Sequence, residues 1–191
     1  MDILNWLTEL LIALLVLGAV TVYLSSMAGR LDRLHRKIET AYAALDAQLL
    51  RRVAAAQDLA SSGLLDPASA LVLSSAAQAA FVVDADDAGL RSLAESDLTR
   101  SLGAVFEDRE EADAVVLAAG PDVELAEQLL AELAVACRRV ELARRFHNDV
   151  VRSCVALRRR RMARWFRLAG HTPMPTTVDF DDTLPPGLAG R

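Results

Sequence analysis

Three histidines, His35, His147 and His171, are the side chains of this chain best suited to acid–base or metal chemistry. No two of them have metal-ligand spacing, so we expect no metal site. His147 lies near two carboxylates, Glu141 and Asp149, and such a group could carry general acid–base catalysis. A membrane-tethered hydrolase with an interhelical site is therefore one hypothesis. Because His147 also falls on the apolar face of a helix, we favour a hydrogen-bonded histidine in the core.

The two cysteines, Cys137 and Cys154, are predicted to lie on one helix. At a rise of about 1.5 Å per residue their separation would be roughly 25 Å, several times what a disulfide spans. An intrachain disulfide is therefore excluded if the helix forms. Both fall on or beside the apolar face, where cysteine behaves as a small buried hydrophobe.

Sequence motifs of the common enzyme classes are missing. The chain has no P-loop, no dinucleotide fingerprint and no nucleophile elbow. Arg109-Glu110-Glu111 is faintly similar to a nucleotide-pyrophosphatase box, but the upstream glycine and glutamate are absent. We interpret this acidic stretch as a solvated helix face. The prediction is a protein that is not an enzyme and needs no cofactor.

The most charged run of the chain is a cationic segment that we call the arginine-rich end. It comprises Arg158, Arg159, Arg160, Arg161, Arg164, Trp165, Phe166 and Arg167. Anionic lipid headgroups would attract it by roughly 1 kcal/mol per arginine near the surface. Nucleic acid is an alternative anion, and an ordinary helix end that favours its own dipole is a further interpretation. A net charge of −5 and a membrane tether favour lipid, so no nucleic acid is expected.

A long amphipathic helix, from about residue 122 to residue 167, is predicted to position these groups. Apolar or small residues recur in steps of three and four, with His147 the only polar member: Ala126, Leu129, Leu133, Ala136, Val140, Ala143, His147, Val150, Cys154 and Leu157. Such a period of 3.5 is typical of a narrow seam that packs against partner helices in a bundle or coiled coil. Pro121 suits the helix start.

An apolar segment near the N-terminus is predicted to cross a membrane. Nineteen residues, 10–28, carry no charge, which is about enough to cross the hydrocarbon layer. A cleavable signal peptide is the alternative, but the segment before it carries Asp2 and Glu9 and no Lys or Arg. Arg30, Arg33, Arg36 and Lys37 follow the segment, and this flank is expected in the cytoplasm.

Three further helices are predicted between these two. The first continues from the apolar segment and ends before Gly63. Its apolar seam begins at Leu31 and consists of Leu31, Leu34, Ile38, Ala41, Leu45, Gln48 or Leu49, Arg52 or Val53, Ala56 and Leu59. The second, about 67–83, starts at Asp66 as N-cap and turns inward Leu71, Val72, Ser75, Ala79 and Val82. The third, about 88–117, turns inward Leu90, Ala94, Leu98, Val105 and Phe106.

The fold class follows from these elements. We predict an all-α chain with an N-terminal single transmembrane helix followed by an antiparallel four-helix bundle of long helices. Its parts are a membrane anchor (1–28), a cytoplasmic helical bundle (29–170) and an irregular or disordered tail (171–191), which is rich in Pro and Asp. Since the first helix leaves the membrane, the fourth must return toward it. The arginine-rich end is therefore expected beside the membrane surface.

Three segments carry a recognisable pattern: residues 41–52 (AYAALDAQLLRR), residues 94–98 (AESDL) and residues 143–151 (ARRFHNDVV). They resemble, in this order, the "AW..IDVQL.RR" segment, the "AENEL" helix start and the "ARRFYNDAV" stretch of LemA proteins. Their order and spacing agree from residue 1 to about 182. The chain departs from the family at His147, at Asp58-Leu59, at Gly120-Pro121 and at Arg158 to Arg161. The resemblance thus implies a divergent member.

Membership would imply a membrane-anchored antiparallel helical bundle whose biochemical role is not established. We therefore expect a scaffold or adaptor in the bacterial inner membrane. It would cross the membrane once, with the N-terminus outside and the main domain in the cytoplasm. A protein partner or a second copy of the chain, besides anionic lipid headgroups, is the expected binding partner.

Overall fold

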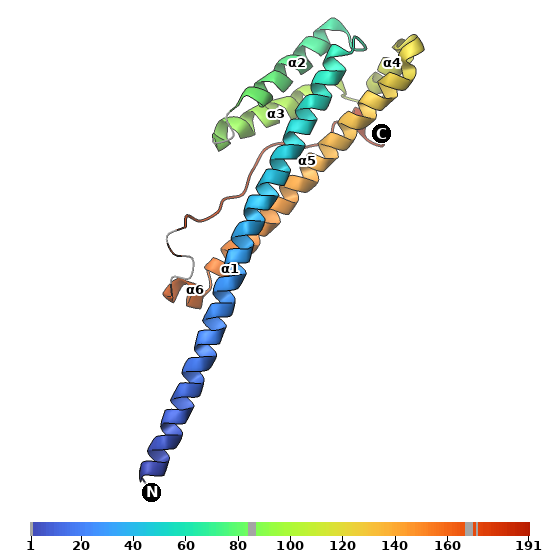
Figure 1. Ribbon diagram of the computed structural model, residues 1–191. Coiled ribbons are helices and arrows are strands. Elements are labelled where there is room, and N and C mark those ends of the chain that lie inside the picture. The colour runs from blue at the N-terminus through green and yellow to red at the C-terminus, as the bar shows by residue number, and fades with distance from the viewer. Residues whose placement is uncertain (1, 84–86, 167–169, 171) are drawn as a thin grey trace. The chain divides into compact units, whose positions relative to one another are not determined.

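The structure, a computed structural model, describes residues 2–83, 87–166, 170 and 172–191. Helices and turns account for the regular structure of these residues, and no strand occurs among them. In chain order the elements are α1 (Asp2–Ser61), α2 (Pro67–Val82), α3 (Ala88–Val105), α4 (Arg109–Ala118), η1 (Gly120–Asp122), α5 (Val123–Arg158), α6 (Arg161–Trp165) and η2 (Pro186–Leu188) (Figure 1). The all-α prediction is confirmed.

Helix α1 is continuous, so the apolar segment and the seam that follows it belong to one helix of 60 residues. Gly29 leaves no break in it, because a helix tolerates a single glycine at a cost of about 1 kcal/mol. Its N-terminal part is long and apolar enough to cross a membrane, a property that a signal sequence shares. The side chains from Leu10 to Val22 are almost all exposed.

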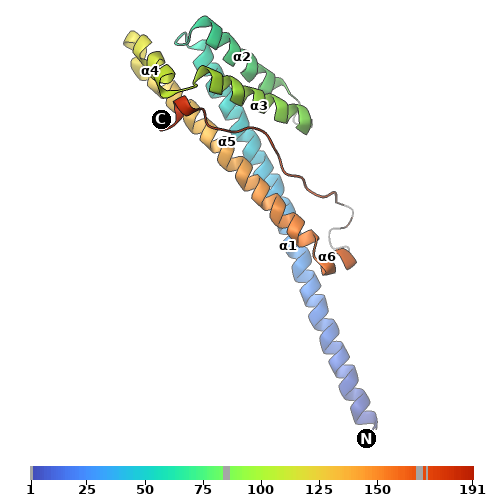
Figure 2. The same ribbon diagram turned by 180° about the vertical axis from the view of Figure 1, so that it is seen from behind.

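The chain divides into two compact units. Unit 1 contains residues 1–40 and 149–177, and unit 2 contains residues 41–148 and 178–191. In unit 2, the second part of α1 and the first part of α5 lie side by side and run in opposite directions, and α2 packs on α3 (Figures 1 and 2). The two long helices thus provide the faces on which the other elements of unit 2 pack.

The core of unit 2 contains the seams predicted on α1 and α5. On α1 the side chains of Leu45, Leu49, Val53, Ala56 and Leu59 are buried, and on α5 those of Ala126, Leu133, Ala136, Val140 and His147. Arg52 of the same seam is buried as well, at 1% exposure, because it pairs with Glu95. A sustained 3.5-residue period therefore predicted both buried faces correctly.

The inward face predicted for α2 is wrong. Leu73, Ala77 and Ala80 are buried, whereas Leu71 and Val82 are exposed. Helix α2 contains no charged residue and is apolar around most of its circumference, so periodicity had no basis for selecting a face. Its start is as predicted: the Asp66 side chain accepts hydrogen bonds from the amides of Ala68 (2.9 Å) and Ser69 (3.1 Å).

The third predicted helix is two helices, α3 and α4. Phe106 leaves the helical path with its side chain fully buried, and its carbonyl accepts a hydrogen bond from the amide of Gly187 (3.1 Å). Asp108 then caps α4 by accepting from the amide of Glu111 (3.1 Å). Ala94 and Leu98 face inward as predicted, but Leu90 is exposed. The break follows from burying Phe106 and from the cap, not from Gly103.

Unit 1 has a small apolar cluster in which α1 meets the end of α5. Its buried members are Met27, Leu31, Cys154, Leu157 and Ala163. The fourth predicted helix does not run unbroken to residue 167: α5 ends at Arg158, Arg160 is extended, and α6 follows. The break turns Ala163 into the cluster, and it relieves the repulsion of like charges one turn apart in the arginine run.

Residues 178–191 of unit 2 have little regular structure, yet they are packed. Phe180 is buried beside Leu45, Leu49 and Val140, and Leu188 is fully buried in the main core. Residues 178–191 are thus irregular in structure and packed at the same time. Phe180 and Leu188 are buried and Val178 and Leu184 are partly buried, which composition alone does not reveal.

Candidate functional site

The arginine-rich end presents most of its cations to solvent. Arg159, Arg160, Arg161 and Arg164 are exposed, and so are Trp165 (78%) and Phe166 (50%). Arg158 differs, since its guanidinium donates hydrogen bonds to the carbonyls of Pro173 and Thr172, each at 2.6 Å. Arg167 and His171 lie outside the described residues. Four arginines and two aromatic rings therefore form an exposed surface.

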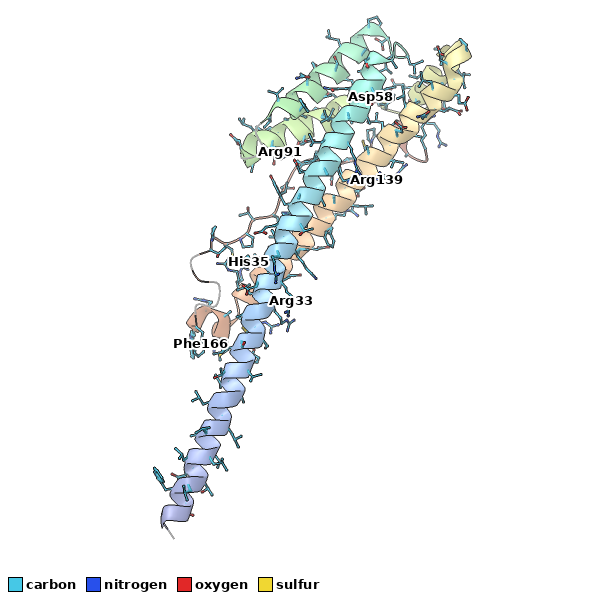
Figure 3. The ribbon with its side chains drawn as sticks, viewed as in Figure 1. Arg33, His35, Asp58, Arg91, Arg139 and Phe166 are labelled. Carbon is cyan, nitrogen blue, oxygen red and sulfur yellow. The ribbon has the colours of Figure 1, made fainter. Side chains whose placement is uncertain are left out.

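This exposed surface lies at the end of the apolar part of α1, within unit 1. Cys154 and Leu157 of α5 and Ala163 of α6 share a buried cluster with Met27 and Leu31 of α1. The charged flank of α1 begins at the same level, with Arg30 and Arg33 exposed. Figure 3 shows Arg33 and His35 on α1 and Phe166 at the end of α6. Within unit 1, the cations that follow the apolar part of α1 and the cations of the arginine-rich end thus lie near the same end of that apolar part.

A histidine–cysteine contact was not predicted from the sequence. The Nε2 atom of His35 lies 3.9 Å from the Sγ atom of Cys154. Burial raises the pKa of the Cys154 thiol, which keeps it protonated and a weak nucleophile at neutral pH. The spacing of 119 residues hides this contact in the sequence; only the pairing of the two predicted seams could have suggested it. Both cysteines are free and buried, as predicted.

His147 lies in the core of unit 2, as the seam predicted. It is 3% exposed, and its ring meets the Tyr42 ring edge-on with centroids 5.7 Å apart. Its Nδ1 atom is buried without a hydrogen-bond partner. Burial lowers the pKa of His147, which favours the neutral imidazole.

The carboxylates considered with His147 are engaged elsewhere. Glu141 pairs with Arg145, and Asp149 pairs with Arg152 at 2.5 Å. No group of three or more potential metal ligands occurs within the described part of the chain. In the stretch that resembled a pyrophosphatase box, Glu111 accepts a hydrogen bond from the amide of Glu107 (2.9 Å) and thus helps to begin α4. Both carboxylates therefore pair with arginines of their own helix.

Sequence reasoning missed two polar side chains of α5, Arg144 and Asn148, that bind the tail. Arg144 donates two hydrogen bonds to the Asp182 carboxylate, at 2.7 and 2.8 Å. Asn148 pairs with the backbone of Val178 through both atoms of its amide. The alternation of apolar and acidic residues from Val178 to Asp182 was the available signal, because that pattern is typical of an extended segment with one buried face.

Comparison of the chain with protein-family models, with curated proteins and with solved structures finds no match. What the site can do is therefore argued from its own residues. Of the groups that the sequence brought forward, most described members of the arginine-rich end are exposed, whereas Arg158 binds the carbonyls of Pro173 and Thr172. Among the described residues, His35 contacts Cys154, and Glu141 and Asp149 pair with arginines.

Proposed function

We propose that this protein is a membrane-anchored helical scaffold or adaptor of the LemA type, and that its arginine-rich end binds the anionic surface of the membrane that α1 crosses. The apolar part of α1 would form a single span. The positive flank would keep the body in the cytoplasm, with the N-terminus outside. The family assignment rests on the three sequence motifs, and it is part of the proposal.

One observation carries the proposal: α5 returns to the end of the apolar part of α1. Met27 and Leu31 lie at the charged end of that part, and they bury Cys154 and Leu157. Arg159 to Arg161 and Arg164 follow directly in the chain. An arginine contributes about 1 kcal/mol only within roughly one Debye length, about 8 Å, of an anionic surface. The contact supports the proposal, because it lies at the end of the apolar part of α1, where the membrane surface would be.

The exposed aromatic rings support the same surface. Trp165 and Phe166 are of the kinds that settle at the level of lipid headgroups, where one part of the ring system is apolar and the surroundings are wet. In water alone, their exposure beside four exposed arginines would have no stabilising role. The scaffold role is proposed because a long helical body continues from an apolar segment that could anchor it in a membrane.

The experiment uses Trp165 as a reporter in the full chain. The chain has two tryptophans, so Trp6→Phe leaves Trp165 as the only one. The protein is reconstituted in vesicles with brominated lipid, with and without anionic lipid. We expect Trp165 to be quenched strongly only where anionic lipid is present. Equal quenching in both vesicles, or none, would contradict the proposal.

A matched pair of variants assigns the effect to the arginine-rich end. Arg161→Gln with Arg164→Gln should reduce the quenching that depends on anionic lipid. Arg51→Gln with Arg139→Gln, which removes two exposed arginines of unit 2, should leave it unchanged. Circular dichroism should show equal helix content in both variants. Equal loss in the two would indicate a response to net charge and not to this surface.

A further inference from the structure

The tail segment 178–182, which we call the strap, lies in a groove of unit 2 as an extended peptide. Val178 and Phe180 line a cavity together with Leu45, Leu49 and Arg91, and Phe180 is buried. Asp182 is mostly buried against Arg144, whereas the Asp179 side chain is 95% exposed. Alternate side chains thus face the groove, the period of an extended chain.

Side chains of the helices bind the strap backbone without regard to its sequence. The Asn148 amide accepts from the Val178 nitrogen and donates to the Val178 carbonyl, both at 2.9 Å. The Thr99 hydroxyl donates to the Asp181 carbonyl (2.6 Å), and the Ser96 hydroxyl accepts from the Asp181 nitrogen (3.1 Å). Backbone bonds of this kind supply affinity for an extended peptide, whatever its residues.

The groove contacts three side chains of the strap, which are Val178, Phe180 and Asp182. Phe180 packs on Leu45, Leu49 and Val140, and the Arg144 guanidinium lies over its ring, 5.6 Å from the centroid. The same guanidinium binds Asp182 with two hydrogen bonds. The groove therefore selects an apolar residue, then an aromatic residue two positions later, then a carboxylate two positions after that.

The strap does not fill its groove. A cavity of about 40 Å³ remains between Val178, Phe180 and helices α1 and α3. Arg91 lines this cavity and pairs with Asp46 through its Nη2 atom. Its Nη1 atom is buried without a hydrogen-bond partner. Figure 3 shows Arg91 on α3. An unfilled apolar space and an unpaired buried donor both lower stability, and a better-fitting ligand would relieve both.

We propose that this groove is a recognition site for an extended segment of a partner protein, of the pattern apolar–x–aromatic–x–acidic, and that the strap occupies it as an internal competitor. The partner segment differs from the strap in a larger first apolar residue and in an acceptor that reaches Arg91. The inference goes beyond the membrane role and does not depend on it. Because the strap belongs to the same chain as the groove, it competes at an effective concentration of the order of millimolar, so the strap would exclude weak ligands.

The test measures binding of a fluorescent peptide with the sequence of residues 176–183 to the full chain in detergent. The parent chain should bind it weakly, because its own strap competes. A chain with Phe180→Ser and Asp182→Asn, which loosens the strap and leaves the groove intact, should bind the peptide at least tenfold more tightly. Equal binding to the two chains would show that the strap is a fixed part of the core and would overturn the proposal.

Two further measurements make the result specific. Arg144→Gln, added to the loosened chain, should weaken binding about tenfold, and a peptide with Leu in place of Val178 should bind more tightly than the parent peptide. Unchanged binding in either case would overturn the assigned pockets. A parent chain that is dimeric by light scattering and becomes monomeric on Phe180→Ser would assign the groove to a second copy's strap, and this would overturn the partner protein as its occupant.

Discussion

In unit 2 an arginine is placed in the core, whereas in unit 1 the arginines lie in water and the apolar helix beside them is exposed. Arg52 is 1% exposed and donates to the Glu95 carboxylate (2.5 Å), to the Glu95 carbonyl (3.2 Å) and to the Thr99 hydroxyl (3.0 Å). In unit 1, Leu14, Leu15 and Leu17 are about two-thirds exposed. Arg159 and Arg161 have no ion pair within the described part of the chain.

The two units differ in whether their charged and apolar side chains contact other side chains of the same unit or are exposed. A buried charge is tolerated only when its partner and its remaining hydrogen bonds are also buried, and unit 2 supplies nearly all of them internally. An exposed apolar helix gains nothing from water, and under the proposed function the membrane would cover this apolar surface of unit 1. Unit 2, by contrast, buries its charges and its apolar side chains against one another.

The largest expected effect comes from breaking the buried ion pair. Glu95→Gln leaves the Arg52 charge buried without its counter-charge, and we expect a loss of about 3–5 kcal/mol in the free energy of unfolding. Chemical denaturation of the full chain in detergent, followed by circular dichroism, measures it. Asp97→Asn breaks the exposed pair with Arg100 on the same helix and should cost under about 1 kcal/mol. Equal losses would remove the contrast between buried and exposed charges.

The sequence predicted the elements of the fold where a periodic signal ran over many residues. The seams of α1 and α5 each repeat over about ten positions, and both are buried as predicted. Asp66 before Pro67 likewise marked the start of α2 correctly. A long pattern averages over local exceptions, and a strong N-cap marks one position directly. Both therefore predict structure well.

The sequence did not predict features that depend on a single distant contact. At the break after α3, the side chain of Phe106 is buried and its carbonyl accepts a hydrogen bond from Gly187, 81 residues later, which no local pattern could reveal. Arg52 was a possible seam position, but its partner Glu95 could not be identified from spacing. The candidate surface was predicted because it is a run of like residues, whereas the groove for the strap was not, since its residues come from three helices and the tail.

The second prediction tests whether the tail belongs to the core of unit 2. A Cβ atom at Gly187 would lie 2.3 Å from the carbonyl oxygen of Asp108 and 2.9 Å from that of Phe106. Gly187→Ala should therefore destabilise the chain by about 1–3 kcal/mol. Gly103→Ala is the control: a Cβ there meets nothing within 4 Å, and the change should stabilise helix α3 by about 0.5–1 kcal/mol. If Gly187→Ala is as harmless as its control, the tail is not held in the core.

The smallest effect concerns acid sensitivity, which we expect in unit 2 through His147. Burial lowers the pKa of His147 in the folded chain, while the unfolded imidazole keeps an ordinary value of about 6.5. Below pH 6.5 the unfolded state therefore binds a proton that the folded state binds less readily. Stability contributed by this difference is complete above about pH 6.5 and is lost as the pH falls.

The size of this loss has an upper limit that depends only on the unfolded imidazole. Between pH 7.5 and 5.5 one proton bound to the unfolded state alone costs at most about 1.4 kcal/mol. Unfolding of the full chain and of His147→Phe should be compared at the two pH values, because phenylalanine keeps the ring contact with Tyr42 and does not titrate. The parent should lose more stability than the variant. Equal losses would mean that the acid sensitivity of the chain lies in its carboxylates, and His147 would then be a packing residue alone.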